Sequence, residues 1–154
     1  MKIKRLLFYP MILLSLFTAC NNPEPKNFEL KPLPPGAHQF KSGLKFNRID
    51  YFYIPGGFSY QQSSYARLEK KVSQKVKYLK LEDYDLYSVY IYQETAVING
   101  RYKGGVTGLD GQNKNLIAYI RYKQNDMDTF YIIRNGNVVY DLLLQQETNF
   151  EFDQ

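Results

Sequence analysis

One stripe of apolar residues at helical spacing constrains this chain most, because it stands alone among segments that alternate like strands. The stripe consists of Tyr65, Leu68, Val72, Val76 and Leu79. Steps of three and four residues place these side chains on one side of a helix, so the spacing predicts an amphipathic helix over about residues 60–80. The charged residues on the other sides of this helix are nearly all lysine and arginine, which we interpret as a solvated surface.

Strand-like alternation precedes and follows this helix. Residues 45–54, 85–93 and 116–123 each alternate with a period of two, which predicts three strands. The segment 127–144 predicts a hairpin, because Asn135-Gly136 accepts the positive φ of a two-residue type I′ turn between two apolar runs. The hairpin face that we assign to the core consists of Tyr131, Ile133, Val138, Tyr140 and Leu142.

The order strand, helix, then three or four strands predicts an α+β fold. In this fold one amphipathic helix packs on a curved antiparallel sheet of four to five strands, in the order β-α-β-β-β. The order resembles that of cystatin-like folds. The inhibitory loop of cystatins is not matched, because residues 93–97 have the wrong spacing, so the resemblance implies topology alone.

The amino-terminal segment has the pattern of an export signal. Lys2, Lys4 and Arg5 precede an apolar run of about 14 residues, shorter than the ~20 residues that span a bilayer. The segment Leu16-Phe17-Thr18-Ala19-Cys20 resembles the lipobox of bacterial lipoproteins. This resemblance implies a signal peptide over 1–19 and acylation of the Cys20 thiol, and Asn21 after it implies the outer membrane. The alternative is an ordinary secretory signal.

A proline-rich tether follows Cys20. Residues 20–36 contain five of the seven prolines, which predicts an extended spacer or a disordered leader, and a single globular domain over residues 37–154. Cys20 is the only cysteine, so the chain cannot form an internal disulfide, and acylation gives its thiol a use. Without the three cations of the signal segment the formal net charge falls from +5 to +2, which argues against a nucleic-acid partner.

Catalytic signals are sparse. The one histidine, His38, lies just after the tether, and with Cys20 acylated the usual ligands of a zinc site are missing, so we expect neither a metal nor a cofactor. The carboxylates occur in local clusters, which we interpret as solvated turns: Glu82, Asp83, Asp85, Asp126, Asp128, Glu147, Glu151 and Asp153. We therefore expect no enzymatic activity. The alternative is a small envelope hydrolase that uses a carboxylate pair.

Binding signals are stronger. Residues 99–113 hold five of the ten glycines, which indicates either a long mobile binding loop or a wide bulged hairpin. The chain has 15 tyrosines and no tryptophan, and some of these tyrosines fall on the sheet face that one helix leaves open. The candidate partner-binding residues are Tyr90, Tyr92, Arg101, Tyr102, Lys103 and Tyr119.

Together these features predict a non-enzymatic lipoprotein of the cell envelope. It is anchored by lipid, most simply in the outer membrane, and binds a protein partner as an immunity or inhibitor protein or as an accessory of an envelope assembly. A glycan- or peptidoglycan-binding module is a further alternative, because tyrosine suits sugar surfaces as well as protein surfaces.

Overall fold

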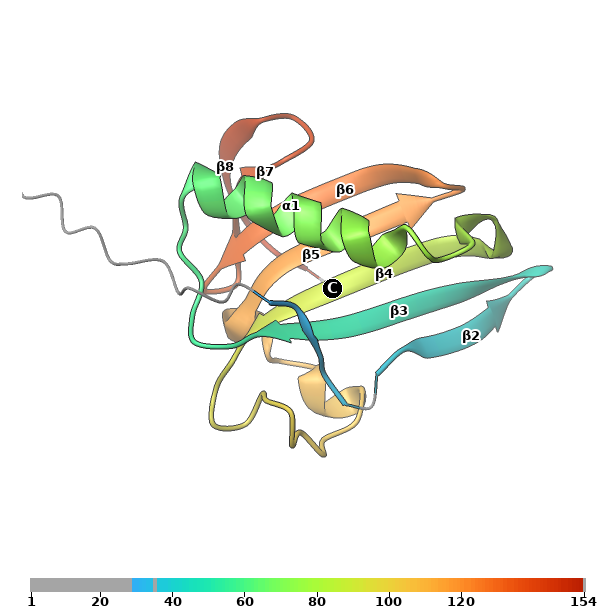
Figure 1. Cartoon of the computed structure of the whole chain (residues 1–154), viewed down its shortest axis with the longest axis horizontal. Helices are drawn as coiled ribbons and strands as arrows, with labels where there is room; N and C mark the ends of the chain where they lie inside the picture. The colour runs from blue at the N-terminus through green and yellow to red at the C-terminus, as the bar shows by residue number, and fades with distance from the viewer. Residues whose placement is uncertain (1–28, 35, 154) are drawn as a thin grey trace, which may run out of the picture.

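The computed structural model describes residues 29–34 and 36–153, which form one large sheet with a long helix across it (Figure 1). The strands are β1 (Lys31–Pro32), β2 (His38–Ser42), β3 (Lys45–Ile54), β4 (Tyr84–Gln93), β5 (Leu116–Lys123), β6 (Asp126–Arg134), β7 (Asn137–Asp141) and β8 (Gln146–Glu151). The helices are α1 (Gln62–Val76) and the 3-10 turns η1 (Leu81–Asp83), η2 (Thr107–Leu109) and η3 (Asn113–Asn115). The sheet order is β1-β3-β4-β5-β6-β7-β8, and β2 also pairs with β3.

The sheet is larger than predicted and it is mixed. The expectation of an antiparallel sheet of four to five strands is wrong, because the sheet has eight strands and β3 pairs with β4 in parallel. The helix explains the direction: α1 carries the chain back along the sheet after β3, so β4 starts at the same end as β3. This parallel pair also rules out the cystatin-like topology. Alternation predicts strands, but it does not encode their directions.

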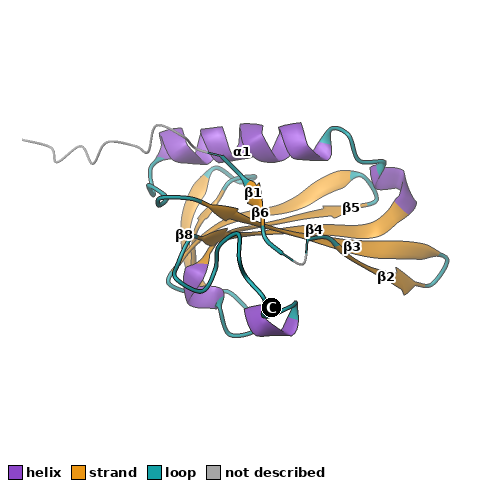
Figure 2. Ribbon diagram, turned by 60° about the horizontal axis from the view of Figure 1, so that its bottom comes forward, coloured by secondary structure: helices purple, strands orange, loops and turns teal. Residues whose placement is uncertain are grey.

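The helix forms where the apolar stripe predicts it. Tyr65, Leu68, Val72 and Val76 are buried against the sheet, and Leu79, just past the end of α1, is partly buried there. Figure 2 shows α1 lying on one face of the sheet, which we call the helix face. Its core is completed by aliphatic and aromatic side chains of the central strands, among them Ile54, Ile91, Ile120, Phe130 and Ile132.

The opposite face, which we call the far face, is also largely covered. The connection between β4 and β5, with η2 and η3, lies below the sheet in Figure 2. This connection contributes buried side chains to the far face, and so do Leu33, just after β1, and Phe152, near the carboxyl end. The second core consists of Leu33, Tyr51, Tyr53, Tyr92, Ile98, Tyr102, Leu109, Leu116, Ile133, Val138 and Phe152. The central strands are therefore buried on both sides.

The folded domain starts earlier than predicted. Leu30 and Leu33, placed in the tether by the sequence, are buried, and the Leu33 amide donates a hydrogen bond to the carbonyl of Tyr51 (2.9 Å). The boundary at Ala37 is therefore too late. Proline does not prevent this pairing, because an edge strand tolerates a missing backbone donor. The signal segment 1–19, Cys20 and the tether as far as residue 28 lie outside the described residues.

The predicted hairpin forms, with one shift of register. Asn135 and Gly136 have φ of 54° and 85°, and Ile133 pairs with Val138 as predicted. A bulge then pairs Ile132 with Tyr140. One extra residue turns the following side chains to the opposite face. The single core face predicted for this hairpin is therefore wrong: Ile133 and Val138 belong to the far-face core, whereas Tyr140 and Leu142 belong to the helix-face core.

Within the part of the chain that the structure describes, none of the helices combines the length and the apolar character that crossing a bilayer requires.

Candidate functional site

Four tyrosines form a row across the far face. Tyr51 on β3 pairs with Tyr90 on β4, Tyr90 pairs with Tyr119 on β5, and Tyr119 pairs with Tyr131 on β6. Paired residues on neighbouring strands point to the same side of a sheet, so the register alone brings the four phenols together. The ring centroids of Tyr51 and Tyr90 lie 5.6 Å apart, and those of Tyr90 and Tyr119 lie 4.9 Å apart. We call these four residues the tyrosine row.

The row is buried at one end and accessible at the other. Tyr51 is part of the far-face core, whereas Tyr90, Tyr119 and Tyr131 are half-buried. The end of the chain borders the accessible part, because the ring of Phe152 lies 5.2 Å from that of Tyr119 and the ring of Phe150 lies edge-on to Tyr131 at 5.5 Å. The accessible phenols are thus held between the sheet and the carboxyl-terminal segment.

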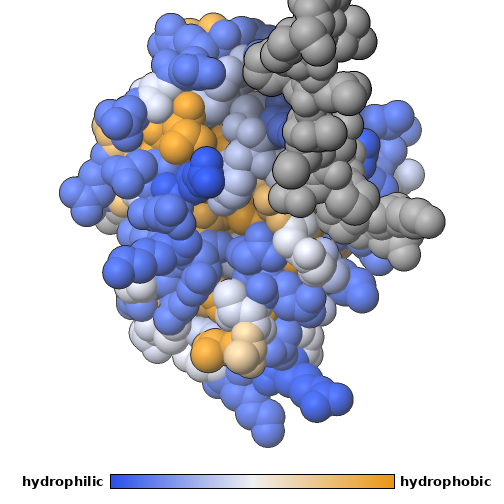
Figure 3. All heavy atoms as spheres, turned by 90° about the vertical axis from the view of Figure 1, so that its left-hand side faces the viewer, coloured by the Kyte–Doolittle hydropathy of each residue, from blue (hydrophilic) through white to orange (hydrophobic). Residues whose placement is uncertain are grey.

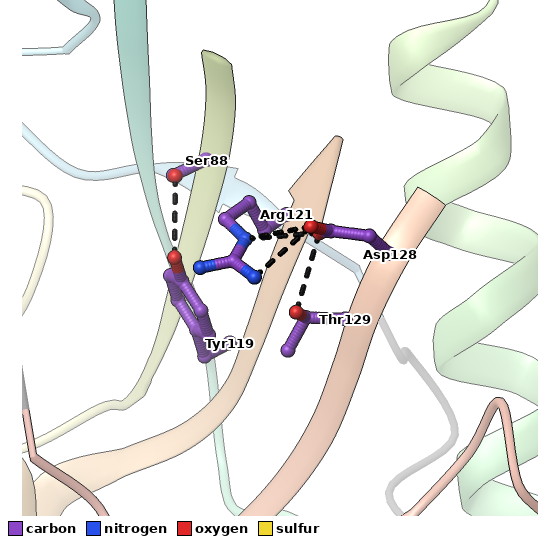
Figure 4. A network of polar contacts seen from close by, with 5 residues as sticks. All are labelled: Ser88, Tyr119, Arg121, Asp128 and Thr129. Carbon is purple, nitrogen blue, oxygen red and sulfur yellow. Dashed lines mark hydrogen bonds and ion pairs between the residues drawn. The ribbon is translucent and has the colours of Figure 1, made fainter. Parts of the chain in front are cut away.

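A group of polar side chains lies next to the tyrosine row on the same face of the sheet. It is centred on Arg121, two residues after Tyr119 on β5. Arg121 on β5 donates hydrogen bonds to both carboxylate oxygens of Asp128 on β6, from Nε (2.9 and 3.2 Å) and from Nη2 (3.0 Å), and Thr129 donates to the same carboxylate (3.2 Å; Figure 4). The Ser88 and Tyr119 hydroxyls lie 3.4 Å apart. A bulge makes this possible, because the register moves from Arg121–Thr129 to Tyr122–Met127 and leaves Asp128 between the two pairs.

The polar group is charged and fixed. The hydrogen bonds from Arg121 lower the pKa of Asp128, and the same contact raises the pKa of Arg121. Both groups are therefore ionised at neutral pH, and the guanidinium is held in one orientation beside the tyrosine row. Burial and the neighbouring Tyr119 raise the pKa of Tyr90, so its phenol remains a neutral hydrogen-bonding group.

These side chains line a hollow of about 360 Å³, which we call the tyrosine hollow. A volume of this order lies at the lower end of the range found for small-ligand sites, ~300–1,000 Å³. Its lining comes from β4, β5, β6, β8 and the residues after β8: Tyr90, Tyr119, Arg121, Thr129, Tyr131, Phe150, Glu151, Phe152 and Asp153. It therefore offers aromatic walls, one fixed guanidinium and two carboxylates on its carboxyl-terminal side.

The predicted binding residues separate into three groups. Tyr90 and Tyr119 line the hollow, on the sheet face that α1 leaves uncovered, as the alternation predicts. Tyr92 and Tyr102 are buried in the far-face core, so they do not offer a surface to a partner. Arg101 and Lys103 are exposed on the β4–β5 connection, outside the residues that line the hollow.

The glycine-rich segment has a packing role that neither predicted alternative describes. Its residues cover the far face, and the Tyr102 hydroxyl donates a hydrogen bond to the carbonyl of Gly105 (3.0 Å). A Cβ at Gly104 or Gly108 would collide with the same hydroxyl. These two glycines therefore make room for the Tyr102 ring.

The sequence analysis missed the residues that complete the hollow. The signal for Arg121 was present, since it follows Tyr119 at a spacing of two, whereas the sequence analysis assigned Tyr131 to the core face of the hairpin. The signal for Phe150 and Phe152 was weaker, because β8 is short and most of its side chains are exposed. His38 lies exposed on β2, away from the hollow.

Over the described part of the chain, no group of three or more histidine, cysteine, aspartate or glutamate residues is arranged to hold a metal ion. Comparison with known protein families, with curated proteins and with solved structures finds no match for this chain. The geometry of the hollow is therefore the basis for a functional proposal.

Proposed function

We propose that this chain is a non-enzymatic, lipid-anchored protein of the bacterial cell envelope that binds a protein partner in the tyrosine hollow. The observation that carries the proposal is the accessible end of the tyrosine row beside the fixed guanidinium of Arg121. Tyrosine and arginine contribute most to binding energy in protein interfaces, because they combine large contact area with directional hydrogen bonds. Here their positions are set by the sheet before any partner arrives, which lowers the entropy cost of binding.

The anchor in this proposal is Cys20. The lipobox-like segment Leu16–Cys20 supports it, and so does the absence of a second cysteine with which Cys20 could form a disulfide. Several acyl chains would hold the protein stably, whereas one chain alone binds a membrane only marginally. A partner of this kind is an envelope-targeting hydrolase that the protein inhibits, or a subunit of an envelope assembly.

A glycan is the second candidate ligand, because aromatic rings next to polar groups also suit sugars. The ring planes in the hollow favour a protein, since Tyr90 and Tyr119 are inclined at 50° to each other and Tyr119 and Phe152 at 51°. A sugar ring packs the C–H bonds of one face best on coplanar aromatic rings. The hydrolase alternative has less support, because Arg121 lowers the pKa of Asp128 and so disfavours the protonated form that a general acid needs.

Site-specific photo-crosslinking in cells tests the proposal. A p-benzoylphenylalanine replacing Tyr131 in the full chain should give a covalent protein adduct, and Arg121→Ala in the same chain should reduce its yield. The matched control carries the crosslinker in place of Tyr78, a highly exposed tyrosine after α1, and should not give this adduct. Equal adducts at the two positions, or an adduct that Arg121→Ala leaves unchanged, would contradict the proposal. A carbohydrate adduct would favour the glycan alternative.

The anchor has its own test. Mass spectrometry of the mature protein should show an acylated Cys20 as the first residue, and Cys20→Ser should release the protein from membranes after a high-salt wash. A Cys20→Ser variant that resists the wash would contradict the anchor.

A further inference from the structure

The tip of the β2–β3 hairpin exposes large apolar side chains to solvent. Leu44 is 100% exposed, and Phe40 and Phe46 on the two strands are 42% and 41% exposed. Single exposed apolar residues are common on protein surfaces, but three within seven residues at the end of one projecting hairpin form a local concentration.

The hairpin presents these side chains at its free end. Ser42 pairs with Lys45, and Gly43 takes the positive φ (64°) that a two-residue turn requires, so Leu44 stands at the tip. Pairing between β3 and β4 starts only at Phe46, and Figure 1 shows the hairpin extending past the end of the sheet. The turn and the Ser42–Lys45 pair therefore extend past the start of β4, with Phe40 and Phe46 behind them on opposite faces of the hairpin.

The charges on the hairpin itself are positive. From His38 to Ile49 the sequence contains Lys41, Lys45 and Arg48 and no carboxylate. Asp50 binds Arg48 through Oδ1 (2.8 Å), which leaves the two lysines as the cations next to the apolar tip. Carboxylates of two neighbouring elements lie near the base of the tip: Glu82 and Asp83 of η1 come just before Tyr84, the β4 residue that pairs with Phe46, and Asp85 of β4 comes just after it.

We propose that this tip inserts into the interface of an anionic lipid membrane, as a contact separate from the acyl anchor. Apolar side chains that enter the acyl boundary, with lysines at headgroup level, are the combination that binds an anionic bilayer surface. Lysine suits this position because its hydrocarbon stem lies along apolar surface while its ammonium group remains in water.

The tip can reach the membrane in which Cys20 is anchored. This part of the inference rests on the proposed function, which supplies the anchor. β1 pairs with β3 at Phe52 and Tyr53, so the tip lies about nine strand residues away, ~30 Å. The eleven residues from Cys20 to Lys31 span at most ~36–40 Å. Both contacts can therefore lie in one membrane plane when the tether runs back along the domain.

Vesicle binding by residues 21–154 tests the inference without the anchor. The fragment retains every residue of the two described cores, which lie within residues 30–152. Because this fragment lacks Cys20, Leu44→Cys gives it a single cysteine, which is labelled with an environment-sensitive fluorophore. Its emission should shift to the blue with vesicles of phosphatidylethanolamine and phosphatidylglycerol, and much less with phosphatidylcholine alone.

Unlabelled variants measure how much the tip contributes. Leu44→Asp should weaken binding to the anionic vesicles about tenfold or more, and Lys41→Gln or Lys45→Gln about fivefold each. Leu144→Asp is the matched control, because Leu144 is 65% exposed in the β7–β8 turn, at the end of the molecule opposite the hairpin. On the visible part of that end, apolar surface is broken into small areas among hydrophilic side chains (Figure 3).

Equal vesicle binding by Leu44→Asp and Leu144→Asp would overturn the inference. So would a label that responds to envelope proteins but not to vesicles, since the tip would then be a protein contact. These outcomes are independent of crosslinking at Tyr131 and of acylation at Cys20, so failure of the inference is distinguishable from failure of the proposed function.

Discussion

At the scale of single residues, the contact between Arg121 and Asp128 determines what the tyrosine hollow offers to a ligand. The guanidinium cannot lose its proton under any physiological condition, and the carboxylate fixes its orientation. The contact depends on the bulge that leaves Asp128 between two register pairs, so a one-residue irregularity of β6 shapes the site. An arginine fixed in this way loses less side-chain entropy when a partner binds.

Asp128→Asn should lower stability in a pH-dependent way. Because Arg121 lowers the pKa of Asp128 below 3.8, the stabilisation is fully present above that value and is lost as the pH falls through the folded-state pKa. The pair is partly exposed, so the expected loss at pH 7 is about 0.5 kcal/mol. Urea unfolding at neutral and acidic pH measures it, with Asp126→Asn at the start of β6 as control. A difference that grows towards acidic pH would show that the pair does not stabilise the fold.

At the scale of elements, the β4–β5 connection is a structural layer. It has little regular structure, yet Ile98, Tyr102 and Leu109 are buried beneath the sheet. Its glycines follow from this packing, because Gly108 faces the Tyr102 hydroxyl. A glycine-rich loop of this length is therefore not evidence of mobility when its apolar residues have a surface to cover.

Gly108→Ala tests this role. The new Cβ would collide with the Tyr102 hydroxyl, and we expect a loss of about 1–3 kcal/mol in the free energy of unfolding. Tyr102→Phe alone should cost ~0.5–1.5 kcal/mol, because it removes the hydrogen bond to Gly105. The double variant should be close to Tyr102→Phe alone, since the phenyl ring leaves room for the Cβ. Urea unfolding of the four proteins measures the coupling, and additive losses would contradict the proposed contact.

Sequence periodicity predicts some elements of this fold and misses others. The helix stripe and the Asn135-Gly136 turn were predictable, because each depends on residues close together in the chain. Half of the tyrosine row was predictable for the same reason, since alternation places Tyr90 and Tyr119 on the far face. The cover of the far face was not, because its buried residues follow no period. Nor was the bulge at Ile132, which no local pattern marks.

At the scale of the whole molecule, one sheet is shared by two cores. Neighbouring residues of a strand belong to opposite faces, such as Ile91 under α1 and Tyr92 above the β4–β5 connection. The parallel pairing of β3 with β4 adds to this arrangement, because α1 must cross the sheet between them. The direction of β4 was not predictable from alternation, since it depends on where the helix returns the chain.

A sheet shared in this way should unfold as one unit. If either α1 or the β4–β5 connection detaches, the central strands lose burial on one face. Contacts on the other face alone must then offset the conformational entropy lost when these strands become ordered. Leu68→Ala on α1 and Leu109→Ala in η2 should each lower the free energy of unfolding by about 2–5 kcal/mol, because both side chains are buried. Each variant should accelerate hydrogen exchange of the slowest amides in α1 and in residues 98–109 by the same factor, measured on peptides by mass spectrometry. If Leu109→Ala accelerated exchange only in 98–109, that layer would open on its own, and the sheet would not unfold as one unit with it.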